Sequence, residues 1–246
     1  MTDPLAPLLD LPGVAEAVTT ARDSVAEVHR HPTNRRGWPT TAAEASVRAA
    51  RASAVLDGGR AEIPTEGTVT DPVLAGSLRV AEALGPLLPT WERAPRQALA
   101  RLHVLAAADL TDQSQLGRPR PDPDITSRLD LLANLVAGGT KAPGPILAAI
   151  VHAELLALSP FPTANGVIAR AAARLTLIST GLDPKGLTVP EVAYLRQAPR
   201  YRTTTAAFAT GDPTAIADWI TFSCHAITQG AQEATTIATA AIPPQP

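Results

Sequence analysis

The side chains most able to do chemistry lie around residues 159–174. Asn165 and Gly166 open a strongly apolar stretch that carries Arg170 and Arg174. The first turn of a helix has unpaired backbone N–H groups and a partial positive dipole, so it is a natural anion site. Two arginines on one helix face need carboxylate or phosphate partners if they are buried. Asn165, Gly166 and Arg170 are therefore candidate anion- or nucleotide-binding residues, although Asn165 fits an N-cap equally well.

Two histidines and one serine are weaker candidates. His152 lies on an apolar stretch and is expected to be a core histidine bonded to the backbone. His103 has no identifiable partner in the sequence and is interpreted as structural. Ser159 lacks both a glycine-flanked elbow and an assignable His–Asp pair, so we interpret it as a polar residue at a helix end rather than a nucleophile. None of the three is assigned a catalytic role.

The run Ser159-Pro-Phe-Pro-Thr-Ala-Asn-Gly-Val-Ile-Ala-Arg170 resembles the signature of the Fic (Fido) domain family, H-P-F-x-(D/E)-G-N-G-R-x-x-R. The matching positions are Pro160, Phe161, Asn165, Gly166 and Arg170. His152 and the downstream run from Tyr201 through Trp219 to Phe222 agree with the family's flanking pattern, so the resemblance covers about residues 40–230. Most Fic proteins are bacterial enzymes that move AMP from ATP onto a target hydroxyl. The resemblance therefore implies a bacterial source, a helical fold and ATP as the ligand to consider.

Four departures from the signature bear on activity. Ser159 stands where the family has its general-base histidine, and losing a positioned base typically costs ~10²–10⁴ in rate. Thr163 replaces the acidic residue that holds Mg²⁺. Ala164 replaces a glycine, and Val167 replaces the first arginine, which clamps phosphate. We therefore expect no ordinary AMP transfer, no metal site and no certain cofactor, with weakened binding of ATP or another nucleotide.

The resemblance also implies a regulatory contact. Many Fic proteins carry an inhibitory helix with the pattern (S/T)-x-x-x-E-(G/N), whose glutamate pairs with the second arginine of the signature and obstructs productive ATP binding. This chain has Ser53-Ala-Val-Leu-Asp57-Gly58. Aspartate is one methylene shorter than glutamate, but a buried arginine needs a carboxylate partner. We predict that Asp57 pairs with Arg170; in an inactive protein this pair would be architectural.

Hydrophobic periodicity and helix-end signals predict an all-α, Fic-like bundle around a central buried helix pair. No run has the alternation of a strand. The expected helices span about 14–29, 41–57, 71–84, 91–110, 125–136, 146–158, 165–179 and 213–240. We divide the chain into an N-terminal helical region (1–70) that contains the inhibitory-type helix (41–57), a helical core (71–240) and a frayed tail (241–246).

Helix starts and loops have their own signals. Asp71 and Asp212 each precede a proline and are expected to be N-caps. The sequences 41–44 and 188–191 each match a capping box. Residues 60–70 are expected to form a linker and residues 117–124 a rigid polar loop with solvated arginines. Residues 137–144 occupy the position we assign to the family's target-docking flap, or form a simple connector.

Composition excludes several classes of function. Hydrophobic residues make up 45% of the 246 residues and the net charge is −2, so a core can form and no general basic field recruits nucleic acid or anionic membrane. The basic cluster at 29–36 is interpreted as a solvated turn. A single cysteine, Cys224, excludes an internal disulfide and a multi-cysteine zinc site. No secretory signal or bilayer-spanning segment is found, which makes the cytoplasm the expected location.

Three hypotheses follow. The first is a degenerate Fic-fold protein that acts as a non-catalytic binding or regulatory module, with another protein as its partner. The second is a transferase of altered chemistry that still binds a nucleotide through Asn165, Gly166 and Arg170. The third, an unrelated bundle with a coincidental motif, predicts that residues 159–166 do not join two buried helices. The sequence names neither an oligomeric state nor a pathway.

Overall fold

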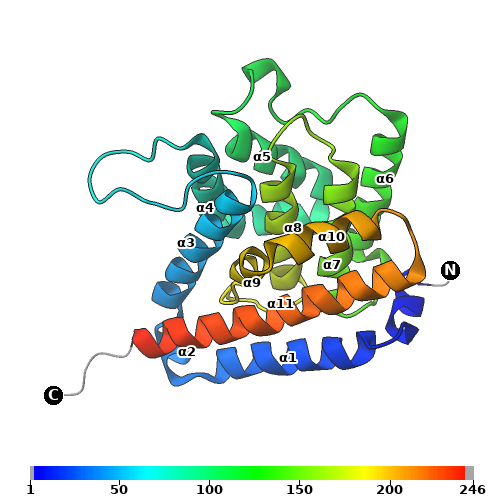
Figure 1. Ribbon diagram of the computed structural model, residues 1–246, viewed down its shortest axis with the longest axis horizontal. Coiled ribbons are helices and arrows are strands. Elements are labelled where there is room, and N and C mark those ends of the chain that lie inside the picture. The colour runs from blue at the N-terminus through cyan, green and yellow to red at the C-terminus, as the bar shows by residue number, and fades with distance from the viewer. Residues whose placement is uncertain (1–2, 242–246) are drawn as a thin grey trace.

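The computed structural model describes residues 3–241, and all regular structure in that range is helical (Figure 1). The all-α prediction is confirmed. Most of the predicted frayed tail lies outside the described residues. The α-helices are α1 (Val14–Arg30), α2 (Pro32–Arg36), α3 (Trp38–Leu56), α4 (Pro72–Arg93), α5 (Pro95–Ala107), α6 (Pro123–Asn134), α7 (Gly144–Leu158), α8 (Asn165–Ser179), α9 (Pro190–Arg196), α10 (Ala198–Phe208) and α11 (Pro213–Ala240); short turns are η1 (Ala6–Asp10), η2 (Gln113–Gln115) and η3 (Leu135–Gly139).

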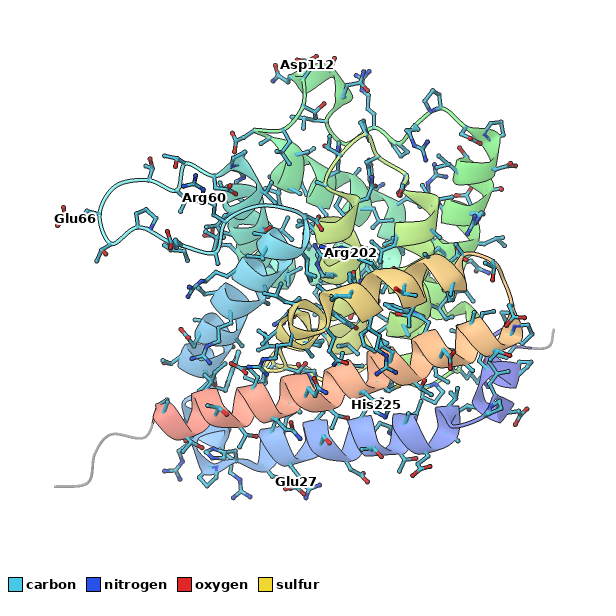
Figure 2. The ribbon with its side chains drawn as sticks, viewed as in Figure 1. Glu27, Arg60, Glu66, Asp112, Arg202 and His225 are labelled. Carbon is cyan, nitrogen blue, oxygen red and sulfur yellow. The ribbon has the colours of Figure 1, made fainter. Side chains whose placement is uncertain are left out.

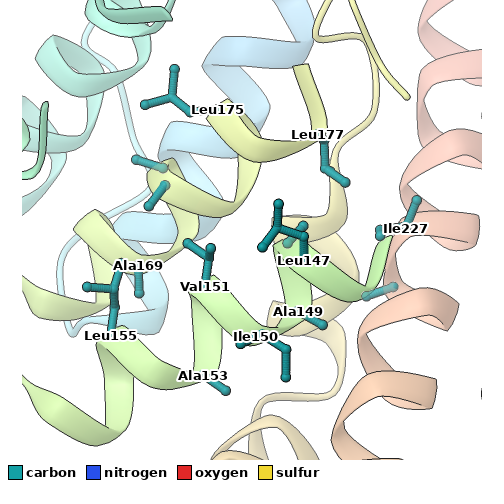
Figure 3. Packing of buried hydrophobic residues seen from close by; sticks show 14 of the residues in the cluster. Leu147, Ala149, Ile150, Val151, Ala153, Leu155, Ala169, Leu175, Leu177 and Ile227 are labelled. Carbon is teal, nitrogen blue, oxygen red and sulfur yellow. The ribbon is translucent and has the colours of Figure 1, made fainter. Parts of the chain in front are cut away.

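The centre of the fold is the pair α7 and α8, which pack against each other. Helix α7 is apolar on all sides, so it can be stable only when other helices surround it. Its side chains interleave with those of α8 and α11 in one continuous core, as at Val151, Leu175 and Ile227 (Figure 3). The segment 159–164 joins these two buried helices, which contradicts the hypothesis of a coincidental motif.

The remaining helices surround this pair. Helix α1 lies along α11 at one side, and α3 packs against α4, α8 and α9 (Figure 1). Charged and polar side chains cover the outside, as Glu27, Asp112 and Arg202 show (Figure 2). Among the described residues, no helix is both long and apolar enough to cross a bilayer.

Two predicted N-caps are confirmed. The Asp71 carboxylate accepts a hydrogen bond from the Leu74 backbone N–H (2.8 Å) at the start of α4. Asp212 accepts one from the Thr214 N–H (2.9 Å) at the start of α11. Each carboxylate satisfies an orphan donor at the positive end of a helix, and the following proline already has the helical φ angle.

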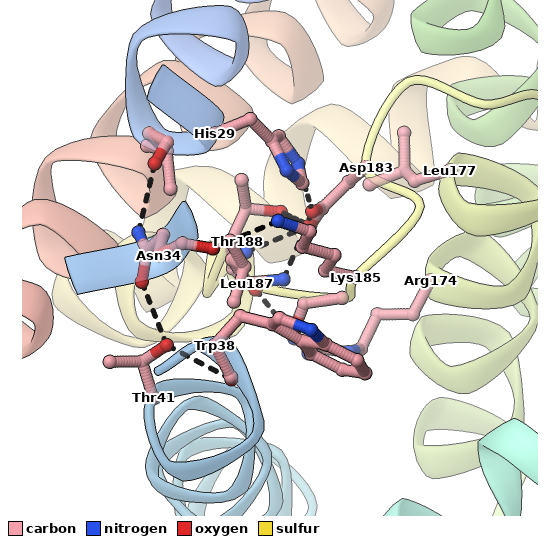
Figure 4. Close-up of polar contacts among 12 residues, drawn as sticks. His29, Asn34, Trp38, Thr41, Arg174, Leu177, Asp183, Lys185, Leu187 and Thr188 are labelled. Carbon is pink, nitrogen blue, oxygen red and sulfur yellow. Dashed lines mark hydrogen bonds and ion pairs between the residues drawn. The ribbon is translucent and has the colours of Figure 1, made fainter. Parts of the chain in front are cut away.

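Both predicted capping boxes are wrong. Helix α3 begins at Trp38, so Thr41 lies inside it, where its hydroxyl donates to the Asn34 side chain (2.8 Å; Figure 4). Thr188 precedes α9, but its hydroxyl donates to Asp183 (2.7 Å) instead of capping the helix. In both places the hydroxyl bonds to a buried polar side chain a few positions earlier in the chain, seven for Thr41 and five for Thr188, instead of capping a helix.

The basic cluster at 29–36 is also less solvated than predicted. His29 is hydrogen-bonded through Nε2 to the buried Asp183 carboxylate at 2.9 Å. This contact attaches the end of α1 to the segment that follows α8 (Figure 4). Four hydrogen-bonding groups therefore meet at one carboxylate, because Asp183 also accepts from the backbone N–H groups of Leu187 and Thr188 and from the Thr188 hydroxyl.

Helix α4 continues beyond its predicted end at residue 84. It passes through Pro86 and Pro89 to Arg93, so α5 begins only at Pro95. A proline inside a helix removes one backbone hydrogen bond and crowds the preceding turn. Both prolines lie on the exposed side of α4, where water can satisfy the carbonyl groups that they leave unbonded.

Candidate functional site

The signature segment forms a tight loop between α7 and α8. Ser159 ends α7 with a left-handed backbone (φ 43°), and Ala164 precedes α8 with another (φ 58°). The Ser159 hydroxyl donates to the Leu156 carbonyl (2.9 Å), which fits its interpretation as a helix-end residue. Ala164 adopts the conformation that the family's glycine would adopt freely, and it carries the steric cost of a Cβ there.

Asn165 holds this loop closed. Its side-chain amide donates to the Phe161 carbonyl (2.8 Å), and its Oδ1 accepts from the Phe161 N–H (3.0 Å). The N-cap position is Ala164 and has no side-chain cap, so the N-cap alternative for Asn165 is wrong. The competing demand is local: two unpaired backbone groups of the loop take both ends of the amide.

Asp57 pairs with Arg170 as predicted. One carboxylate oxygen accepts a hydrogen bond from Arg170 Nη2 at 2.8 Å, with the arginine side chain 2% exposed and that of Asp57 22% exposed. Ser53, one turn earlier on α3, adds two bonds to the same guanidinium: its Oγ accepts from Nε (2.8 Å) and its carbonyl from Nη2 (3.0 Å). The end of α3 thus supplies most of the acceptors for Arg170.

The same carboxylate lies on the N-terminus of α8. The second oxygen of Asp57 accepts from the Val167 backbone N–H at 3.0 Å. Gly166 permits this approach, because a Cβ at that position would lie 2.3 Å from the first oxygen. The helix end predicted to bind an anion therefore binds one from its own chain.

A buried polar chain continues behind Arg170. Arg170 Nη1 donates to the Tyr201 hydroxyl (3.3 Å), which lies 2.8 Å from Nε2 of His152. Burial, and then the charge of Arg170, hold the pKa of His152 well below its usual 6.5. The prediction that His152 bonds to backbone is wrong; its partner is a tyrosine hydroxyl from α10. Burial alone would lower the pKa of Arg170, but Asp57 and Tyr201 raise it overall.

Arg174 does not share this site. Its guanidinium donates to the carbonyls of Thr188 (2.7 Å) and Gly186 (2.9 Å), and to the Glu191 carboxylate at 3.3 Å. The predicted shared helix face is present, but each arginine has its own carboxylate. The two buried positive charges are therefore balanced by two separate partners.

Phe161 and Pro160 anchor the loop from the other side. The Phe161 ring is 2% exposed and stacks on His103, with centroids 4.4 Å apart. His103 Nδ1 accepts from the Gly117 N–H at 2.8 Å, and burial lowers the pKa of His103. The Pro160 carbonyl accepts from the Arg120 N–H at 2.8 Å. His103 is structural as predicted, and it does have partners.

Arg120 is a residue that the sequence interpretation missed. Its Nε donates to the Ser159 carbonyl (3.0 Å) and its Nη2 to the Leu158 carbonyl (2.9 Å), so it caps the C-terminus of α7. A cation at that end of a helix also interacts favourably with the helix dipole. A proline-rich, polar loop gave no sign of this contact, because the carbonyl groups lie 38 and 39 positions further along the chain.

The cleft beside this loop has a volume of about 480 Å³. Its lining is mostly apolar, with the hydroxyl-bearing residues Ser159 and Thr163, and Asp57 is the one charged residue among the residues that line it. A larger cleft of about 750 Å³ lies at the other end of α7 and α8 and contains no signature residue. Size alone does not identify the site, so we assign it by the signature loop.

The flap interpretation of residues 137–144 is wrong. This segment precedes α7, whereas the signature loop follows it, and a helix of 15 residues separates their ends by about 22 Å. The segment between α5 and α6 does contact the signature loop, through the hydrogen bonds of Arg120. Residues 137–144 are a connector, held by bonds from the Thr140 hydroxyl and the Lys141 N–H to Asp3.

No protein-family model matches the sequence, and no curated protein matches it. Solved structures do resemble the fold. A Fic family protein from Desulfovibrio desulfuricans G20 superposes with a TM-score of 0.67 at 19% identity, over 92% of this chain and 74% of that one. Part of Fic-1 from C. elegans gives 0.67 at 14% identity, over 97% and 76%. A Fic domain containing signaling protein from Bacteroides thetaiotaomicron VPI-5482 gives 0.61 at 13%, over 91% and 98%. The chain has the Fic domain fold.

Proposed function

We propose that this Fic-fold chain is catalytically degenerate and acts as a non-catalytic binding or regulatory module for another protein. The observation that carries the proposal is the position of Asp57. Its carboxylate pairs with Arg170 and accepts the Val167 N–H at the start of α8. A phosphate entering that helix end would meet a fixed negative charge and no free cation from Arg170.

The chemistry of the loop supports the same conclusion. Ser159 cannot act as a base near neutral pH, and its hydroxyl already donates to Leu156. Val167 is a buried apolar residue at the position of a phosphate-clamping arginine. Thr163 offers a neutral hydroxyl where the family coordinates Mg²⁺ through a carboxylate. These residues therefore do not fit Mg²⁺–ATP.

The shape of the cleft supports a protein as ligand. Its walls include Val73, Ala106, Leu110, Leu156 and Val167, which suit an apolar side chain better than a triphosphate. The loop that borders it is held rigidly by Asn165, and a preformed surface lowers the entropic cost of binding. A preformed, mostly apolar cleft is suited to binding a side chain of a partner protein.

A thermal-shift titration with ATP, other nucleotides and Mg²⁺ tests the nucleotide part of the proposal. A ligand at about 100 times its Kd stabilises a fold by about 2.7 kcal/mol. We expect no shift with the wild type at millimolar nucleotide. The Asp57→Ala variant tests whether the carboxylate blocks an anion site, and Asp23→Asn, an exposed carboxylate away from this cleft, is the matched control.

The alternative is a nucleotide-binding transferase of altered chemistry. The cleft volume favours it, because about 480 Å³ lies within the range of small-molecule sites. This alternative predicts a Mg²⁺-dependent thermal shift in the wild type together with labelling of a target protein. Labelling that is abolished by Asn165→Ala or Arg170→Met would establish it and reject the first proposal.

Affinity capture from the native cell tests the partner directly. We expect a protein captured by the wild type to be lost with Leu110→Glu, which places a charge in the cleft. Leu131→Glu is the matched control, because Leu131 is a 66% exposed leucine outside this cleft. Equal capture by both variants would show that the cleft does not bind the partner.

A further inference from the structure

The direction of the hydrogen bonds behind Arg170 fixes the tautomer of His152. A guanidinium only donates, so the Tyr201 hydroxyl accepts from Arg170 Nη1. Among the described residues the Tyr201 hydroxyl has no other hydrogen-bond partner, so its own proton is satisfied only when it is donated to Nε2 of His152, 2.8 Å away. Nε2 must be the acceptor, and the neutral imidazole therefore carries its proton on Nδ1.

This proton has no protein acceptor. Nδ1 of His152 is fully buried and makes no hydrogen bond to any atom of residues 3–241. A buried donor without a partner is costly, and native proteins satisfy such groups with protein atoms or ordered water. The Nδ1–H group of His152 therefore needs an acceptor that can lie within hydrogen-bond distance of it.

Two small cavities lie beside the buried arginines, and both have apolar as well as polar lining residues. The first, of about 10 Å³, is lined on its polar side by His152, Arg174, Glu191, Tyr194 and Ser223. The second, of about 20 Å³, lies between α3, α4 and α8 and is lined by Ser46, Ser53 and Ser77 together with both arginines and Glu191. A buried water needs about 10–15 Å³ of such volume and two to four polar partners.

We propose that each cavity binds one ordered water, and that the water in the first accepts a hydrogen bond from Nδ1–H of His152 and donates one to the Glu191 carboxylate. Glu191 has capacity for it, because its one hydrogen bond among the described residues is from Arg174, at 3.3 Å. The second water bonds to the serine hydroxyls and the guanidinium groups. The buried ion pairs of α8 are thus hydrated on both sides.

His103 supplies an internal control for the tautomer. It is also fully buried, but its Nδ1 accepts from the Gly117 backbone N–H, so its proton must be on Nε2. The two buried histidines are therefore expected to be neutral with opposite tautomers. Long-range ¹H–¹⁵N correlation of the uniformly labelled chain at pH 7 distinguishes the two forms. Protonated Nδ1 in His152 beside protonated Nε2 in His103 supports the proposal; protonated Nε2 in His152 overturns it.

The waters themselves are tested by magnetisation transfer from solvent to cavity methyl groups. Ala148 and Ile227 report on the first cavity, and Ala50 and Val80 on the second. We expect cross-peaks to all four, and none to Leu102, which lies in the core outside both cavities. Ser223→Ala and Tyr194→Phe check that the transfer does not come from side-chain hydroxyl protons.

The His152→Phe variant separates the two sites. It removes the Nδ1 donor from the first cavity and leaves the second intact. We expect the cross-peaks to Ala148 and Ile227 to disappear and those to Ala50 and Val80 to remain. The assignment would be overturned if the wild type showed no cross-peaks from water at either cavity. It would also be overturned if the cross-peaks at the first cavity were unchanged in His152→Phe.

Discussion

The carboxylate of Asp57 lies 2.8 Å from the guanidinium of Arg170, 113 positions further along the chain. The contact joins the first residue after α3 to the middle of α8 and places a negative charge on the α8 N-terminus. One carboxylate thereby satisfies a buried cation and a helix end. This arrangement has consequences for stability that can be measured separately from function.

Breaking the pair should destabilise the chain strongly. Arg170→Met and Asp57→Ala are each expected to lower the free energy of unfolding by about 2–5 kcal/mol, because each leaves the other partner uncompensated. Urea unfolding of both variants and the double variant gives their coupling, expected at about 1–3 kcal/mol. The half-exposed pair Arg128–Glu154 is the control, with coupling below about 1 kcal/mol. Similar coupling in the two pairs would contradict the account.

The effect of Gly166→Ala on the free energy of unfolding should depend on whether the Asp57 carboxylate is present. In the wild type the new Cβ meets the Asp57 carboxylate, and we expect a loss of about 1–3 kcal/mol. In an Asp57→Ala background the same substitution should be neutral or stabilise by up to about 1 kcal/mol, since alanine is the better helix former. Gly85→Ala, on an open face of α4, is the control and should change the free energy of unfolding by the same amount in both backgrounds. A loss that persists without Asp57 would place the clash elsewhere.

Ala164→Gly should stabilise the chain. Ala164 has a φ of 58°, which costs a residue with a Cβ about 1–2 kcal/mol, partly offset by the chain entropy that glycine loses on folding. We expect a net gain of about 0.5–1 kcal/mol in thermal or urea unfolding. Ala43→Gly, at an exposed position inside α3, should lower the free energy of unfolding by about 1 kcal/mol. Destabilisation by both glycines would show that the left-handed backbone carries no strain.

Stability should fall as pH drops below about 6.5. Burial lowers the pKa values of His152 and His103 in the folded chain, so the unfolded chain binds more protons in this range. The associated stability is complete above the unfolded pKa of 6.5 and is lost as pH falls, by up to about 1.4 kcal/mol per pH unit for each histidine that stays neutral. The free energy of unfolding should be measured from pH 7 to pH 5. Its slope against pH should be shallower for His152→Gln than for the wild type, and unchanged for the exposed His225→Gln. A His152→Gln slope equal to that of the wild type would contradict the account.

The sequence predicts those parts of the fold whose signal is local. Residues 165–179 form a helix at the predicted limits because a loop with two prolines precedes a long, mostly apolar run. Asp71 and Asp212 cap their helices because the acceptor and the donor lie three or fewer residues apart. The Asp57–Arg170 pair could be expected only from the family resemblance.

The errors arise where the packed fold gives a side chain a different partner from the one that the sequence pattern indicates. Thr41 and Thr188 bond to the buried side chains of Asn34 and Asp183, a few positions earlier, instead of capping helices. Asn165 closes its own loop, and Arg120 reaches carbonyl groups across the fold. The Arg120 contact depends on which surfaces the packed helices bring together, so spacing along the chain contains no information on it. The contacts of Thr41, Thr188 and Asn165 span seven, five and four positions, and each replaces the helix cap that the local pattern indicates.

Calorimetric titration of ATP with Mg²⁺ into the wild-type chain tests whether the N-terminus of α8 can still bind a nucleotide. We expect no saturable heat up to millimolar nucleotide, which corresponds to a binding free energy weaker than about −4 kcal/mol. The reason is that the chain's own carboxylate occupies the α8 N-terminus and Arg170 is already paired. Saturable binding with a micromolar Kd, reduced by Arg170→Met, would contradict it.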